Sequence, residues 1–313
     1  MEEKLISSGQ SPTPYDDVFR TMLVDCSKLV IPVINEVFDK DYTGNEEIRF
    51  RQNEHFEGQQ DGQLGKIITD SSFQIVGKDT KSYLFECQST ADSSMLIRIF
   101  EYATQIALDS HTMQNDRLIV EIPHSALLFL RSTEKTPDLM SIEMRTPGGN
   151  VEFEVPVMKV KNYSIDEVFK KELFFLIPFY IFIYEARFKK MEEQGEGLDE
   201  LREDYRKIFD SLDAAAEKGL ISAFARKTIF EMSNKVLEKI AVRYDKVLEG
   251  VKSVMGGRVL EHEAKNILNE GKLEQAKETA FVLRAMGMNI PNIAKAVNVT
   301  EETVKTWFGV QTA

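Results

Sequence analysis

"ITDSSFQIVGKDTKSYLFECQS", residues 68–89, decides the fold of this chain. Two runs of alternating apolar and polar residues flank the turn-prone segment KDTK, and this pattern predicts a β-hairpin from about Lys66 to Gln88. Asp70 precedes the first run, and Glu86 lies inside the second. The loop is short enough for both carboxylates to converge at one end of a sheet, so fold and chemistry depend on the same stretch.

The second run, SYLFECQ, alternates in a way that separates its polar groups from its apolar ones. Because successive side chains on a strand point to opposite faces, Glu86 and Gln88 share one face, while Phe85 and Cys87 share the other. Cys87 is expected to pack into the inner face of the sheet as a small hydrophobe. The polar face therefore carries the candidate chemistry.

The composition is that of an ordinary soluble globular protein. The 313 residues are 42% hydrophobic and 29% charged, which is enough for one good core and an appended unit. Cys26 and Cys87 show neither a metal-binding spacing nor a disulfide framework, which favours a reducing, cytoplasmic location. Residues 1–14 are acidic and polar, so we expect a flexible tail rather than a signal peptide.

Two features bear on membranes and nucleic acids. The most apolar run, Leu173 to Tyr184, falls short of the roughly 20 residues that span a bilayer, so we predict buried helices and no membrane partner. The net charge of −12 argues against a protein that coats DNA, because non-specific affinity comes from Lys and Arg neutralising phosphates. It does not exclude a metal-dependent nuclease, whose site is itself acidic.

The order of the predicted elements indicates an α/β unit over residues 15–162, followed by helices. The predicted elements are a helix over 15–39 with a kink at Pro32, a strand over 48–51, the hairpin over 66–88, a helix over 93–110, strands over 117–123 and 126–132, and a second hairpin over 141–160 whose turn is TPGGN. Ser164 and Glu167 then form a capping box that opens a helical region over 163–275.

Residues 276–313 have the spacing of a helix-turn-helix. The apolar positions are Ile293, Ala294, Val297, Val299, Val304 and Trp307. Thr300 is a good N-cap for the second helix. A helix that reads DNA usually carries base-reading or phosphate-binding groups near its start, whereas this one begins Glu-Glu-Thr and has only Lys305 as a basic group. We favour a packing or self-association hairpin, and a DNA-reading tail, with a sensor in front, stays open.

The two acids of the first hairpin suggest a metal site. Asp70, Glu86 and the backbone carbonyl of Cys87 would form a cage of hard oxygen ligands, which suits Mg²⁺, with Mn²⁺ as an alternative. Such an ion activates water and neutralises charge that develops on a phosphodiester. Gln88 shares the face of Glu86 and could hold the attacking water, although its neutral amide cannot supply positive charge.

This arrangement of Asp70 and Glu86-Cys87-Gln88 resembles the PD-(D/E)XK nuclease superfamily, in the variant with Gln in place of Lys. The surrounding sequence resembles the recombination-promoting nuclease and transposase-like group within it. The similarity covers residues 14–185 and is carried by YDDVFRTML (15–23), FECQS (85–89), RIFEYATQ (98–105) and VPVMKV with ELFFLIPF (155–179). The chain departs from the pattern in two ways: no Pro precedes Asp70, and Gln88 is not Lys.

The resemblance implies a restriction-endonuclease-like core, α-β-β-β-α-β, followed by an all-helical C-terminal region. It also implies an Mg²⁺-dependent DNA endonuclease linked to recombination or mobile elements. In the family pattern Asp70 and Glu86 bind the metal, and Gln88 replaces the catalytic lysine. The early acid of the pattern corresponds to Asp16, with Asp17 a close second.

The resemblance further implies that Arg98 and Tyr102, which are one helical turn apart, lie beside this site and contact DNA. Arg98 could instead pair with an acid on its own helix, and acids such as Asp16 in a first turn also favour the helix dipole. His55 is expected in a surface loop rather than as a general base. The alternative function is a noncatalytic nuclease-fold protein that binds DNA or a protein partner. DNA is the expected partner, and a homo-oligomer stays open.

Overall fold

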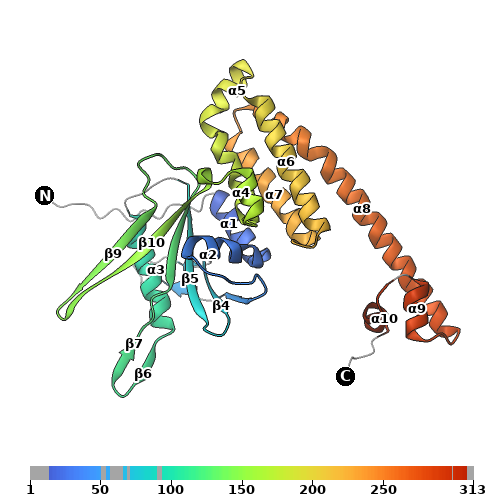
Figure 1. Cartoon of the computed structure of the whole chain (residues 1–313), viewed down its shortest axis with the longest axis horizontal. Coiled ribbons are helices and arrows are strands. Elements are labelled where there is room, and N and C mark those ends of the chain that lie inside the picture. The colour runs from blue at the N-terminus through green and yellow to red at the C-terminus, as the bar shows by residue number, and fades with distance from the viewer. Residues whose placement is uncertain are drawn as a thin grey trace. The chain divides into compact units, whose positions relative to one another are not determined.

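The structure is a computed structural model that describes residues 14–50, 54–56, 66–68, 71–89, 94–297 and 299–308. It is a mixed α/β fold built on a six-stranded sheet, with a helical C-terminal region (Figure 1). The strands follow in spatial order as β1 (Glu47–Phe50), β4 (Ser72–Val76), β5 (Lys81–Gln88), β8 (His124–Phe129), β10 (Gly149–Lys159) and β9 (Leu139–Thr146).

The sheet changes from antiparallel to parallel at β5. β1, β4 and β5 pair antiparallel, β5 and β10 each pair parallel with β8, and β9 pairs antiparallel with β10. The helix α3 (Met95–Asp109) lies in the connection between β5 and β8, as a parallel pair requires. The carboxyl ends of three parallel strands therefore meet at one edge of the sheet.

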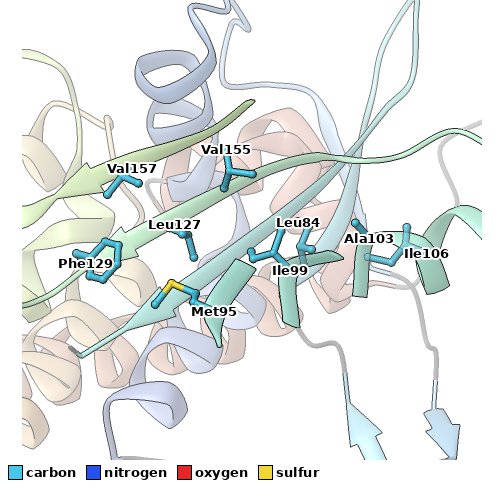
Figure 2. Close-up of a cluster of buried hydrophobic side chains, with 9 residues drawn as sticks. All are labelled: Leu84, Met95, Ile99, Ala103, Ile106, Leu127, Phe129, Val155 and Val157. Atoms are coloured by element: carbon cyan, nitrogen blue, oxygen red, sulfur yellow. The ribbon is translucent and has the colours of Figure 1, made fainter. Parts of the chain in front are cut away.

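One face of the sheet is covered by α3, because this helix repeats its apolar residues at helical spacing. Figure 2 shows side chains from α3 and from three strands directed toward one another. The cluster consists of Leu84, Met95, Ile99, Ala103, Ile106, Leu127, Phe129, Val155 and Val157. On the other face, Phe85 packs against Phe19 of α1 (Pro14–Asp25), with ring centroids 5.4 Å apart. The predicted division of β5 into two faces is confirmed.

The first hairpin is confirmed for β4 and β5, but the prediction that it begins at Lys66 is wrong. Lys66–Ile68 forms β3, which pairs antiparallel with β2 (Glu54–Phe56) in a separate two-stranded sheet. His55 therefore lies on a strand and not in a loop, with Ile67 opposite it. Alternation shows that a segment is a strand, but the partner is chosen by contacts between distant segments. Asp70 lies outside the described residues.

The predicted helix over 15–39 is two helices, and the break does not fall at Pro32. α1 ends at Asp25, a 3₁₀ turn covers Ser27–Leu29, and α2 covers Val30–Phe38. Pro32 is the third residue of α2, where its missing N–H costs nothing because first-turn amides have no partner within the helix. Its ring would clash with the carbonyl of Lys28 in a continuous α-helix, so the chain breaks before it.

The predicted strand over 117–123 does not join the main sheet. Only Arg117–Ile119 is extended, as β7, and it pairs with β6 (Thr112–Gln114) in an exposed ribbon. Asn115 and Asp116 have φ of 46° and 60°, as a two-residue hairpin turn requires, and both residue types tolerate this conformation. The predicted strand over 126–132 and the second hairpin are confirmed as β8 and as β9 with β10.

The helical region opens as the sequence predicts. Ser164 caps α4 (Ile165–Lys170), and its capping box with Glu167 is complete. The apolar run is buried, but it forms the 3₁₀ helix η3 (Phe174–Arg187) instead of α-helix. The helices that follow are α5 (Phe188–Gln194), α6 (Leu198–Glu217), α7 (Ala223–Ile240) and α8 (Asp245–Ala285). No helix within the described ranges has both the length and the apolarity needed to cross a bilayer.

The chain forms two compact units, residues 1–252 and 253–313. The second unit contains α9 (Ile290–Ala296), α10 (Glu301–Trp307) and α8 from Ser253 onward, which is most of that helix. Its core is small: Ala280, Ile293, Ala294 and Val304 are buried, with Val297, Val299 and Trp307 packed around them. The predicted apolar positions of the tail do form this core, and Thr300 is confirmed as N-cap, because it accepts a hydrogen bond from the Thr303 amide at 3.2 Å.

Leu127→Ala is expected to lower the free energy of unfolding by about 2–5 kcal/mol, because it leaves a cavity in a core position that is fully buried. Leu139→Ala on β9 is the matched control, since Leu139 is 48% exposed, and its effect should stay within about 0.5 kcal/mol. Urea unfolding followed by circular dichroism measures both. Equal losses would contradict the described core.

Ile293→Ala is expected to destabilise the second unit alone, because Ile293 is buried in a core that the first unit does not share. Hydrogen exchange should accelerate in α9 and α10 and stay unchanged in β5 and β8. Val282→Ala is the control, since Val282 is 54% exposed on α8. Faster exchange throughout the sheet would show that the two units unfold as one.

Candidate functional site

The carboxyl end of β5 lies beyond the end of its antiparallel partner. β4 pairs with β5 as far as Leu84, and the last described bond on this side joins the Phe85 amide to the Ser71 carbonyl at 3.0 Å. On the other side β8 continues, and the Gln88 carbonyl accepts from the Leu130 amide at 2.9 Å. Among the described residues, Glu86 to Gln88 are therefore paired in the sheet on the β8 side only.

A cavity of about 110 Å³ lies at this end of the strand. Its lining comes from α1, from the residue before β4, from β5 and from α3. The described lining residues are Asp16, Phe19, Arg20, Ser71, Glu86, Cys87 and Tyr102. The fold thus brings two carboxylates, a guanidinium and a phenol together from segments that are far apart in the sequence.

Asp16 reaches the cavity because α1 is fixed by its neighbours. Phe19 lies one turn after Asp16 on the same face and packs edge-on against Phe175 of η3, with centroids 5.3 Å apart. Asp17 instead forms an ion pair with Lys235 of α7, away from the cavity lining. Of the two acids between which the sequence left the choice open, Asp16 is therefore the one that lines the cavity.

The N-terminal turn of α1 is held by a second set of contacts. The guanidinium of Arg131, just after β8, lies 5.7 Å from the ring centroid of Tyr15 and 4.7 Å from that of Phe182. Its Nε and Nη2 donate hydrogen bonds to the two carboxylate oxygens of Glu185, at 2.5 and 2.7 Å. A bidentate ion pair whose guanidinium also lies over two rings has little freedom, so Tyr15, the residue next to Asp16, is held in place.

Glu86 enters the cavity from β5. It is half-buried, and the Ser71 hydroxyl donates a hydrogen bond to its Oε1. Ser71 is therefore a residue that orients Glu86, and the sequence analysis did not identify it.

The charges of both acids affect the thiol of Cys87. Cys87 is buried, as predicted, and burial raises the pKa of its thiol well above the usual value; the negative charges of Asp16 and Glu86 raise it further. Like charges shift a pKa in this way only at short range. The carboxylates of Asp16 and Glu86 are therefore both close to the Cys87 thiol.

The backbone of β5 also contributes an oxygen. The Phe85 amide and the Gln88 carbonyl point to opposite edges of the strand. Because these groups alternate along a strand, the Cys87 carbonyl points to the same edge as the Phe85 amide, where β4 has ended. This is the direction that a ligand carbonyl at the cavity would need.

The other predicted residues differ in position. Tyr102 of α3 lines the cavity, whereas Arg98, one turn earlier, and Gln88 are half-buried and are not among the described lining residues. The sequence analysis also missed Arg20. The signal was available, because Arg20 follows Asp16 by four residues and such residues share one face of a helix.

The donor set fits a hard divalent cation. No group of three or more His, Cys, Asp or Glu side chains that could hold a metal occurs in the described part of the chain, and Asp70, the predicted third acid, lies outside it. Asp16 and Glu86 offer two carboxylates. Mg²⁺ is commonly held by one or two carboxylates together with waters and substrate phosphates, so this pair suits it, whereas a structural zinc site would need four ligands.

Asp16→Asn and Glu86→Gln are each expected to speed alkylation of Cys87 at a fixed pH near 9. Removing a nearby negative charge lowers the thiol pKa and raises the thiolate fraction, and the thiolate is the nucleophile. Peptide mass spectrometry after iodoacetamide treatment resolves Cys87 from Cys26, which is the internal control because neither acid is among the causes of its raised pKa. Asp17→Asn should have no effect. Unchanged Cys87 rates in both variants would contradict the convergence of the acids.

Comparison with known proteins gives no match to this chain among family models, curated proteins or solved structures. What the site can do therefore follows from its own residues.

Proposed function

We propose that this chain is an Mg²⁺-dependent DNA endonuclease that hydrolyses phosphodiester bonds, linked to recombination or mobile elements. The observation that carries the proposal is the meeting of Asp16 and Glu86 at one cavity, with an arginine and a tyrosine beside them. Two carboxylates that suit a cation, next to groups that suit an anion, match the requirements of metal-assisted phosphodiester hydrolysis.

The order of elements supports a restriction-endonuclease-like core. When η1, α2 and the two small ribbons β2–β3 and β6–β7 are left out, α1, β1, β4, β5, α3 and β8 follow the order α-β-β-β-α-β that the resemblance implies. Glu86 lies near the carboxyl end of the third strand of this series, which runs parallel to the fourth. In open α/β sheets, ligands commonly bind at the carboxyl ends of parallel strands.

The chain's own residues have distinct roles in this proposal. Asp16 and Glu86 hold the cation, with Asp70 as a further ligand and Ser71 orienting Glu86. When bound, Mg²⁺ supplies an activated water and neutralises charge on the phosphate. The Tyr102 hydroxyl donates a hydrogen bond to a DNA phosphate, and Arg98 contacts the backbone one turn away. The amide of Gln88 holds a water.

A cation bound by the acidic site would explain how a protein of net charge −12 could act on DNA. Asp16 and Glu86 repel phosphate, so the cation is needed for binding as well as for chemistry. DNA affinity should therefore be low in a chelator. A noncatalytic protein that binds DNA or a partner through the same fold is the alternative.

Asp16→Asn and Glu86→Gln are each expected to reduce nicking of supercoiled plasmid in Mg²⁺ or Mn²⁺ by roughly 100-fold or more, the scale on which a lost electrostatic contact in an active site slows a reaction. Both changes preserve shape, so folding should be unaffected. Asp17→Asn is the matched control, because Asp17 pairs with Lys235 and should leave nicking unchanged. Gel electrophoresis with and without EDTA measures the rates.

Nicking at the wild-type rate by both variants would rule out this site. If the wild-type protein binds DNA but does not cleave it in either metal, the noncatalytic alternative is favoured.

A further inference from the structure

We infer that Arg20 is a catalytic residue that binds the scissile phosphate and supplies the positive charge that the neutral Gln88 cannot. The inference rests on the proposed function and adds to it the residue that recognises the substrate. It follows from three observations: the composition of the cavity lining, the attachment of α1, and the geometry of a guanidinium.

Arg20 is the one cationic residue among the described residues that line the cavity. It shares a face of α1 with Asp16, and Glu86 contributes to the same lining from β5. Arg20 is exposed, whereas Asp16 and Glu86 are half-buried. A phosphate that approaches the two carboxylates from solvent would therefore meet the guanidinium on its way in.

The backbone that carries Arg20 is fixed on several sides. Phe19, the preceding residue, is buried and packs against rings of both β5 and η3. Asp17 pairs with Lys235 of α7, and Tyr15 lies against Arg131. A donor on a rigid helix needs little reorganisation during the reaction, which makes its contribution to rate larger.

The chemistry of the cavity requires a cation of this kind. Two carboxylates hold a metal ion but repel the phosphate that must join it. A guanidinium presents a planar fork of donors that matches two phosphate oxygens, and it stays charged at every working pH. Gln88 lacks charge and is not among the described lining residues, so Arg20 is better placed than Gln88 to meet the phosphate.

In the reaction, a water oxygen forms a bond to phosphorus while the bond from phosphorus to one ester oxygen breaks. One hydrogen of the water passes to solvent, and the leaving oxygen takes a proton from solvent in its place. The other hydrogen stays on the new phosphate monoester, from which it can ionise. Negative charge grows on the two non-bridging oxygens as the new bond forms. Arg20 donates N–H bonds to those oxygens and so stabilises the transition state more than the bound substrate.

The test compares Arg20→Gln and Arg20→Lys with a control, Arg145→Gln. Arg145 is an exposed arginine that pairs with Glu143 on β9, at the opposite edge of the sheet from β1. Two readouts are measured: kcat and KM for plasmid nicking in Mg²⁺, and binding of a DNA duplex in Ca²⁺, a hard cation that takes the same kind of oxygen ligands, at several salt concentrations by fluorescence anisotropy. Thermal unfolding of each variant monitors the fold.

Arg20→Gln is expected to lower kcat by about 100-fold, the scale of one lost transition-state donor. Arg20→Lys should recover part of this loss, because it restores the charge without the fork. The slope of log affinity against log salt should fall by about 0.9 in Arg20→Gln, corresponding to one phosphate contact. Arg145→Gln should match the wild type in kcat.

The role of Arg20 is ruled out, while the proposed function stands, if Asp16→Asn and Glu86→Gln are inactive but Arg20→Gln keeps kcat within about threefold of the wild type. That role is also ruled out if Arg20→Gln and Arg20→Lys lose equal activity and unfold at lower temperature, since Arg20 would then be structural. If the wild type does not cleave, or if both carboxylate variants cleave normally, the proposed function and this inference fail together.

Discussion

The parallel pairing of β5 with β8 is the constraint on which the rest of this molecule depends. The pairing runs from Tyr83 opposite His124 to Gln88 opposite Phe129. Two parallel neighbours cannot be joined by a tight turn, so the chain must cross over, and it does so through α3. The crossover buries one face of the sheet and brings Tyr102 to the end of β5. Within the described residues, β4 pairs with β5 only as far as Leu84, so the last residues of β5 are paired in the sheet on the β8 side.

Aromatic packing on the opposite face then determines which of the two acids of α1, Asp16 or Asp17, lines the cavity. The rings of Phe19, Phe85 and Phe175 contact one another pairwise, so α1, β5 and η3 share one apolar contact. This contact fixes the rotation of α1 about its own axis, and the rotation directs Asp16 to the cavity and Asp17 to Lys235. Neither acid has a property of its own that would select it, since both lie in the first turn of the same helix.

The site is locally unfavourable, as functional sites often are. Two carboxylates lie close enough to raise the pKa of the same buried thiol, and the half-buried Glu86 loses part of its hydration. A fold selected for stability alone would place apolar or neutral groups at the end of β5. A bound cation would relieve the repulsion between the two carboxylates.

Several features could be predicted from the sequence because they depend only on neighbouring residues. They are the two faces of β5, the periodicity of α3, the capping box at Ser164 and the cap at Thr300. The sequence also identified Glu86 as an acid within an apolar strand. The pairing of β3 with β2 and the place of Arg20 in the cavity lining, by contrast, became known from the three-dimensional structure. The two groups of features differ in the distance along the chain over which their causes act. Alternation, helical spacing and caps act over a few residues, whereas strand partners and the rotation of a helix are fixed by packing between segments far apart in the chain.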